Sequence, residues 1–261
     1  MTESKQSIPP ALLLPVAPPA GYLSLDVTNS HEITDNADWT TRRLALMAKE
    51  KEFTRLRDEL SALRRALPWR RLETPYAFVG ADGRRTLAEL FEGKRQLLVY
   101  HFMLGAQTDA GCPSCSFWAD HFDAMRPHLG ARDTAFAVLS AGPIDKLTSY
   151  AKRMDWQFPW LSTAGTDFNE EFAVSFSKEA VESKDKIYNF GTIRAMGQEM
   201  PGASAFIKEG DDIFHTYSTY TRGLDILNPT YHWLDMTAMG RDESALKSPM
   251  AWVRRHDEYG Q

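Results

Sequence analysis

A short apolar run that leads into a Cys-x-x-Cys pair limits the fold of this chain more than any other feature. Residues 96–103, QLLVYHFM, are rich in β-branched and aromatic side chains, as is typical of a buried strand. Cys112 and Cys115 follow the run, and apolar side chains then recur at helical spacing over residues 117–129. The sequence therefore predicts a strand, a loop and a helix, with the two thiols where the helix begins.

The same alternation continues further along the chain. We predict a second strand at residues 134–140, a helix at 143–154 with proline at its start, a short strand at 158–162 and a short helix at 167–172. Strands that alternate with helices are typical of a parallel α/β core. The expected fold class is therefore α/β.

Two β-hairpins are expected beside this core. One lies at residues 76–87 around the Asp82-Gly83 turn, and the other lies at 203–220 around residues 209–212. An amphipathic piece at 223–236 follows the second hairpin.

A long helix is predicted before the core, at residues 38–67. Asp38 is expected as its N-cap, and Pro68 ends it. One face of this helix is an apolar stripe that Lys49 interrupts. The stripe either packs on its own domain or forms a dimer seam, and the sequence leaves both open. The stripe consists of Leu46, Phe53, Leu56, Leu60, Leu63 and Leu67.

These elements suggest a division of the chain into segments. Residues 1–37 are rich in proline and are expected to form an extended N-terminal arm. The main domain is expected at 38–243, with a polar insertion at 174–200 that is either a lid or disordered. Residues 244–261 are expected to form a charged C-terminal tail.

Composition narrows the class of protein. The 261 residues are 43% hydrophobic and 25% charged, which is enough apolar material for a sizeable core and excludes a disordered chain. The net charge of −5 argues against binding to nucleic acid or to an anionic membrane surface. No run reaches the 18 or so apolar residues of a spanning helix, and the start of the chain is a poor signal peptide. We therefore expect a cytoplasmic protein.

The cysteine pair carries the strongest chemical signal. Cys112 at a helix N-terminus would lie beside unpaired N–H groups and the positive end of the helix dipole, which favour its thiolate. Cys115, one turn into the helix, would be more buried and less acidic. The spacing therefore predicts that Cys112 attacks a disulfide and that Cys115 resolves the mixed disulfide.

Two other roles for the cysteines remain open at this point. A structural zinc site needs four ligands, and with no other cysteine it would have to recruit distant histidines. The two cysteines can also be inert core residues. The position of the pair between a strand and a helix favours redox chemistry over both. The histidines considered as zinc ligands are His101, His121 and His215.

The residues around the pair resemble a known family. The run 112–120, CPSCSFWAD, is similar to that of a thioredoxin-clan family labelled predicted dithiol–disulfide oxidoreductase, which began as a domain of unknown function. Further similar stretches lie at 48–60, 97–105, 165–176 and 214–225. The resemblance covers roughly residues 40 to 243.

This resemblance implies a thioredoxin-like core with a mixed central sheet, helices on both faces, and the cysteines at the carboxyl end of a strand. The active-site loop would then comprise Gly111, Pro113 and Ser114 with the two cysteines. Gly111 replaces the tryptophan of thioredoxin, and proline is the first rather than the second intervening residue. The cis-proline position of thioredoxin falls near Gly202, with Pro201 one residue earlier. A substrate groove is predicted at Trp118, Pro201 and Gly202.

The function expected from these observations is thiol–disulfide exchange with a protein or small-molecule substrate, and no cofactor or metal is expected. One alternative is a thiol peroxidase, in which Cys112 forms a sulfenic acid. The peroxiredoxin pattern has threonine or serine where this chain has Asp109. Another alternative is a redox-gated interaction module without turnover, and a homodimer through the long helix or the N-terminal arm is also considered. The chain has no glycine-rich nucleotide motif.

Overall fold

The computed structural model describes residues 32–260. The chain divides after Ala45 into two compact units, and helix α1 (Asn36–Ala66) contains residues of both. The predicted N-terminal arm lies outside the described residues, except for its last few positions.

Helix α1 begins two residues earlier than predicted. The Asp35 carboxylate accepts a hydrogen bond from the Asp38 N–H at 2.9 Å, so Asp35 takes the capping role and the prediction of Asp38 as N-cap is wrong. None of the side chains of α1 is buried. The apolar stripe of this helix therefore does not pack against the described part of its own domain.

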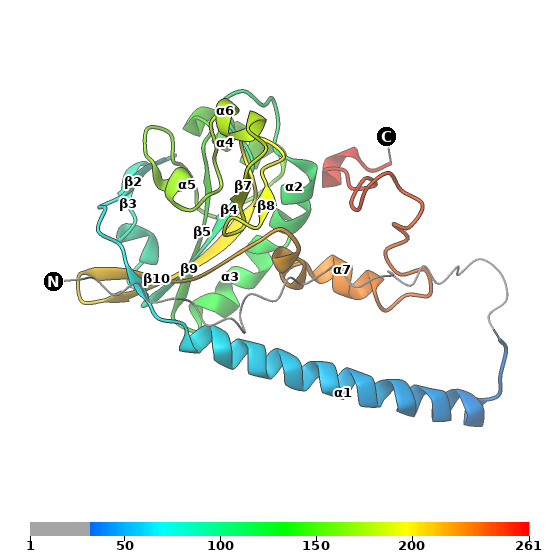
Figure 1. The fold of residues 1–261 in the computed structure, drawn as a ribbon. Coiled ribbons are helices and arrows are strands. Elements are labelled where there is room, and N and C mark those ends of the chain that lie inside the picture. The colour runs from blue at the N-terminus through cyan, green and yellow to red at the C-terminus, as the bar shows by residue number, and fades with distance from the viewer. Residues whose placement is uncertain (1–31, 261) are drawn as a thin grey trace. The chain divides into compact units, whose positions relative to one another are not determined.

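The main sheet is mixed and has eight strands among the described residues. In spatial order these are β1 (Arg70–Arg71), β10 (Asp212–Tyr220), β9 (Gly202–Glu209), β4 (Gln96–His101), β5 (Thr134–Ser140), β6 (Trp160–Ser162), β2 (Ala77–Gly80) and β3 (Gly83–Thr86). Strands β4, β5 and β6 are parallel. Strand β9 is antiparallel to β4 (Figure 1). The parallel core predicted from the alternation is therefore present, with antiparallel hairpins on both sides of it.

Helices and a small second sheet complete the fold. The α-helices after α1 are α2 (Pro113–Ala119), α3 (Phe122–Gly130), α4 (Ile144–Arg153), α5 (Phe168–Glu171), α6 (Lys178–Glu182) and α7 (Pro229–Leu234). The 3₁₀ helices are η2 (Glu89–Phe91), η3 (Thr221–Leu227) and η4 (His256–Glu258). The second sheet pairs β7 (Lys186–Tyr188) with β8 (Ile193–Arg194).

Successive side chains of β4 serve two separate cores, one on each face of the sheet. Leu97 and Val99 belong to the core that includes residues of α5 and η2. Tyr100 belongs to the other core, which includes Cys115 and residues of α2, α3 and α4. A strand buried on both faces reads as a continuous apolar run, which explains the sequence of residues 96–103.

The four central strands have the thioredoxin-like arrangement. Their order is β5-β4-β9-β10, in which a parallel pair joined through helices is followed by an antiparallel hairpin. The predicted fold class, an α/β protein with a thioredoxin-like mixed sheet and a long N-terminal helix, is confirmed. Strand β1 is only two residues long and was not predicted from the sequence.

The apolar pattern after the cysteines forms two helices rather than one. Helix α2 ends at Ala119 and α3 starts at Phe122, with His121 as its N-cap. Side chains on both sides of the break keep helical spacing because both helices pack against the same core. The pattern alone therefore did not reveal the break.

The insertion at 174–200 is ordered, so its interpretation as a disordered segment is wrong. It contains α6, β7 and β8, and it contributes Val174, Tyr188 and Met200 to the buried core. The hydroxyl of Tyr188 donates a hydrogen bond to the Pro201 carbonyl. A few apolar anchors hold this polar segment in place, and such widely spaced anchors produce no period in the sequence.

We expect Tyr188→Ala to loosen this insertion. The Tyr188 side chain is fully buried, so its truncation leaves a cavity, and removal of a large buried aromatic ring typically costs about 3–5 kcal/mol. Phe190→Ala is the matched control, because Phe190 lies in the same insertion and is 73% exposed. Urea unfolding gives the stability of each variant, and limited proteolysis reports on residues 174–200. Equal stability of the two variants would contradict the anchoring role.

Candidate active site

The two cysteines lie where the loop after β4 enters α2. Cys112 is the N-cap residue of this helix, with an extended backbone (φ −56°, ψ 130°), and Pro113 is at the first helical position. Proline is favoured there because its fixed φ suits the helix and its missing N–H would have no partner. The N–H groups of the next residues, Ser114 and Cys115, have no carbonyl partner within the helix and so remain available to the Cys112 side chain.

The environment of Cys112 stabilises its thiolate. Hydrogen bonding from the Cys115 thiol, together with the N–H groups of Cys115 and Ser114 and the Ser114 hydroxyl, lowers the pKa of Cys112 to about 6. Partial burial of the sulfur acts in the opposite direction and is outweighed. Most Cys112 side chains are therefore ionised at neutral pH, and the residue is partly exposed to solvent.

Cys115 has the opposite character. It is 1% exposed, and this burial raises its pKa well above the usual range, with the hydrogen bond to Cys112 and the charge of Cys112 adding to the effect. The Met103 N–H donates a hydrogen bond to the Cys115 sulfur at 3.5 Å, and the Tyr100 hydroxyl also faces this sulfur. Both cysteines are free thiols. The pair therefore combines an accessible thiolate with a buried neutral thiol.

Gly111 has no room for a side chain. A Cβ atom at this position would lie 2.5 Å from Cε1 of Tyr150 and 2.8 Å from Cε1 of Phe102. Glycine thus lets the backbone before Cys112 pass directly over two buried rings. This contact gives a structural reason for glycine at the position where thioredoxin has tryptophan.

A residue far along the chain holds the same backbone. The Arg255 guanidinium donates two hydrogen bonds to the Gly111 carbonyl, at 3.1 Å from Nε and 2.8 Å from Nη2. The Ser116 hydroxyl donates to the Cys112 carbonyl at 2.9 Å and lies 2.9 Å from the Tyr150 hydroxyl. Both carbonyl groups that flank the Cys112 N–H are therefore fixed by side chains.

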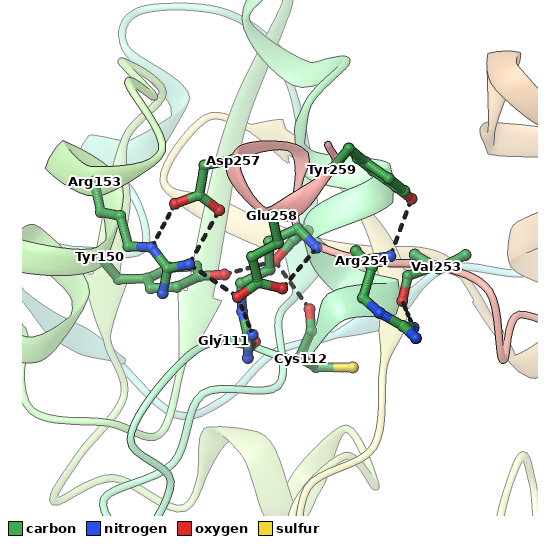
Figure 2. A network of polar contacts seen from close by, with 11 residues as sticks. Gly111, Cys112, Tyr150, Arg153, Val253, Arg254, Asp257, Glu258 and Tyr259 are labelled. Atoms are coloured by element: carbon green, nitrogen blue, oxygen red, sulfur yellow. Dashed lines mark hydrogen bonds and ion pairs between the residues drawn. The ribbon is translucent and has the colours of Figure 1, made fainter. Parts of the chain in front are cut away.

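Ion pairs fasten the segment that carries Arg255. Arg153 of α4 binds Asp257 with two nitrogens, at 2.7 and 3.0 Å, and also binds Glu258 at 3.0 Å (Figure 2). His256 lies 2.6 Å from the carboxylate of Asp120, the residue that follows α2. The charged tail predicted at 244–261 therefore includes a segment that contacts the loop before the cysteines, and sequence reasoning missed this role.

The residues predicted for a substrate groove lie in different environments. Trp118 is 5% exposed, and its Nε1 donates to the Leu224 carbonyl at 2.9 Å, so its indole is a core side chain. Gly202 begins β9 and pairs with His101 at the end of β4. All peptide bonds in the described residues are trans, so Pro201 does not have the cis conformation considered for it. The groove role stays a prediction for Trp118, Pro201 and Gly202, of which Trp118 and Gly202 are buried in this structure.

The histidines weighed as zinc ligands each have a hydroxyl partner. His101 lies 2.8 Å from the Ser204 hydroxyl, His121 lies 2.9 Å from that of Thr230, and His215 lies 2.7 Å from that of Ser218. Burial lowers the pKa of His101 to about 3 and keeps it neutral. Within residues 32–260, no three His, Cys, Asp or Glu side chains come together in a way that would hold a metal ion.

Tyr100, Tyr150 and Arg255 were absent from the predicted site. Tyr100 lies inside the predicted strand, and the period of two places it on the same face as Phe102, so that signal was available. Nothing in the sequence connects Tyr150 or Arg255 to the cysteines, because their contacts depend on the tertiary fold.

No helix in the described part of the chain has the length and apolar character needed to cross a membrane.

Comparison with known proteins gives one family match. Residues 28–259 match a family described as "Bacterial protein of unknown function (DUF899)". No curated protein matches the chain. The match includes Arg255 and the segment around it, and so extends beyond the range over which the sequence motifs were recognised.

Several solved structures are similar to the chain at low identity. Peroxidoxin BcpB from Mycobacterium tuberculosis is 14% identical with a TM-score of 0.44, over 64% of this chain and 95% of that one. Peroxiredoxin Q of Xanthomonas campestris is 14% identical with a TM-score of 0.40, over 61% and 92%. A hypothetical protein from Sinorhizobium meliloti 1021 is 12% identical with a TM-score of 0.36, over 57% and 69%.

We expect Gly111→Ala to destabilise the protein. The added methyl group overlaps the rings of Tyr150 and Phe102, and such overpacking typically costs about 1–3 kcal/mol. Gly105→Ala in the same loop is the control, because its Cβ would meet only the flexible side chain of Glu199, at 3.4 Å. Urea denaturation of the reduced proteins compares them. A Gly111→Ala protein as stable as the control would show that the rings move aside without cost.

Proposed function

The chain belongs to the bacterial family of unknown function that it matches over residues 28–259, and we propose that it is a thiol–disulfide oxidoreductase in which Cys112 attacks and Cys115 resolves. The single observation that carries this proposal is the difference between the two thiols. One is partly exposed with a pKa of about 6, and the other is buried with a raised pKa. Attack needs a thiolate that a substrate can reach, and resolution needs a second thiol within bonding distance.

The proposed reaction balances as two exchanges. The Cys112 thiolate attacks one sulfur of a substrate disulfide, forms a mixed disulfide and releases the other sulfur as a thiolate, which takes a proton from water. Cys115 then loses its proton and attacks the Cys112 sulfur, which releases the second substrate thiolate. The substrate gains two electrons, and the cysteine pair becomes a disulfide. An external dithiol returns the pair to its reduced form.

The mixed disulfide itself activates the resolving thiol. Two of the effects that raise the pKa of Cys115 come from Cys112, namely the hydrogen bond to its thiolate and its negative charge. Both effects disappear when the Cys112 sulfur enters a mixed disulfide. The pKa of Cys115 therefore falls at the step where its thiolate is needed, and burial protects this thiol until then.

The direction of the reaction depends on the reduction potential of the pair. A stabilised thiolate favours the reduced form and makes the couple more oxidising. The pKa of Cys112 lies between the values of about 7 for thioredoxin and about 3.5 for the strong oxidant DsbA. Because the pKa of Cys112 lies between these two values, we expect the reduction potential of the pair to lie between about −270 and −120 mV. A cytoplasmic location, as expected from the sequence, favours the reductase direction.

The rate of alkylation of Cys112 reports on the ionisation of its thiol. The rate of alkylation of Cys112 is expected to rise with pH through a midpoint near 6, because the reactive thiolate forms above the pKa. Cys115→Ala removes the largest cause of the low pKa, so the midpoint should move upward, whereas Cys115→Ser keeps a hydroxyl donor and should move it less. Mass spectrometry of the labelled peptide measures the rate. A midpoint that neither substitution changes would contradict the proposal that Cys115 lowers the pKa of Cys112.

Turnover is measured with a chromogenic aromatic disulfide as the substrate and an external dithiol as the reductant. We expect Cys112→Ser to reduce the rate to the uncatalysed level, because no other thiolate is available. Cys115→Ser should instead accumulate the mixed disulfide on Cys112, visible as one added thiol group by mass spectrometry. The absence of this adduct would contradict the assigned roles. Faster consumption of hydrogen peroxide than of the disulfide by the reduced wild-type chain would favour the peroxidase alternative.

A further inference from the structure

We propose that two copies of this chain pair in parallel through helix α1, along a seam that we call the α1 stripe (Leu46, Phe53, Leu56, Leu60 and Leu63). This proposal does not depend on the cysteine chemistry. It rests on the exposure of the stripe and on the charges beside it.

The stripe is open to solvent in the described chain. Its five side chains are between 42% and 60% exposed, although they lie on one face of a 31-residue helix. Most helices in proteins owe their stability to the packing of such an apolar face rather than to intrinsic propensity. A helix of this length, with no buried side chain, therefore lacks the contact that normally stabilises it.

Contact with the rest of the domain does not cover the stripe. Near the end of α1, the Arg64 guanidinium carbon lies 5.2 Å from the centroid of the Tyr217 ring in β10. The neighbouring Leu63 is still 58% exposed. The domain thus holds the helix from the Arg64 side and leaves the leucine side available.

The stripe has the spacing of a coiled-coil seam. With Leu46, Phe53 and Leu60 at position a of the heptad, Leu56 and Leu63 fall at position d. Leucine is a common residue at position d of coiled coils. The first heptad has Lys49 at d, whose ammonium group is paired with Glu52 at 3.1 Å, so the apolar part of the seam begins at Phe53.

Charged residues on the two flanks of the stripe select a second copy and its direction. Glu52 and Glu59 lie at position g on one flank, and Arg57 and Arg64 lie at position e on the other, where Glu50 occupies the first heptad. In a parallel pair, each g residue faces the e residue of the next heptad in the second helix. Glu52 then faces Arg57 of the second copy. Arg64, the residue opposite Glu59, already lies against Tyr217 of its own domain, so the pairing of Glu52 with Arg57 carries the argument.

An antiparallel pair would bring like charges together, because position g then faces g and position e faces e. Glu52 would face Glu59, and Arg57 would face Arg64. A symmetric pair needs a surface that complements itself, and the acidic and basic flanks of α1 meet this requirement only in the parallel direction. An unrelated partner explains these charges less well, because a single α1 helix already carries both the acidic and the basic residues that would pair in a parallel dimer.

The first test is the mass of the full-length reduced chain in solution, measured by sedimentation velocity over a range of concentrations. We expect a monomer–dimer equilibrium. Leu60→Glu should weaken dimerisation by at least about tenfold, because it places a charge in the seam of both copies. Leu44→Glu is the matched control: Leu44 is 55% exposed on the same helix but lies off the stripe, and its variant should dimerise like the wild type. A chain that is monomeric at all concentrations, or a dimer unaffected by Leu60→Glu, overturns the proposal.

The second test reports the direction of pairing. Glu52→Arg places like charges opposite each other in a parallel dimer and should weaken it about two- to fivefold, in keeping with the modest strength of exposed ion pairs. The double variant Glu52→Arg/Arg57→Glu reverses both charges and should restore the wild-type affinity. In an antiparallel dimer, Glu52→Arg would instead strengthen the association by removing the repulsion from Glu59. That result would overturn the parallel arrangement while leaving the thiol activity untouched.

Discussion

The chemistry of this chain depends on how the end of β4 is joined to the start of α2. The Cys112 N–H donates to the Met103 carbonyl at 3.2 Å, and the Met103 N–H donates to the Cys115 sulfur at 3.5 Å. These two contacts place the first turn of α2 against the strand. The groups at the start of α2 lower the pKa of Cys112, while burial raises the pKa of Cys115. A single helix start thus produces two thiols of opposite character.

The surrounding structure holds this join in place. Buried rings of Tyr150 and Phe102 lie against Gly111, and Arg255 donates hydrogen bonds to its carbonyl, so the backbone before Cys112 has little freedom to shift. Disulfide formation requires the two sulfurs to approach each other, which is a side-chain movement if the backbone is already in place. Because the backbone is held in place, each redox step requires movement of only the cysteine side chains.

The sequence predicted those features that depend on neighbours within a few residues. The strand at 96–101, the helix start at Pro113 and the central alternation all follow from local period and capping preferences, and they were placed to within a few residues. The contact of Arg255 with Gly111 spans 144 positions, and no local pattern encodes it. The insertion was misjudged for a related reason, since single anchors such as Tyr188 carry no period. The thiol asymmetry was predicted because both of its causes, helix start and burial, follow from the position of the pair between a strand and a helix.

The long separation between Gly111 and Arg255 also has a consequence for synthesis on the ribosome. At about 5–20 residues per second, the segment that ends in Arg255 is made roughly 7–30 seconds after the loop that it holds. Strand β9, the antiparallel neighbour of β4, is also made long after it. During this interval the nascent chain already contains both cysteines, β4, β5 and helices α2 to α4, but it lacks Arg255. The loop before Cys112 therefore passes through a stage of synthesis in which the Gly111 carbonyl has not yet received the hydrogen bonds of Arg255.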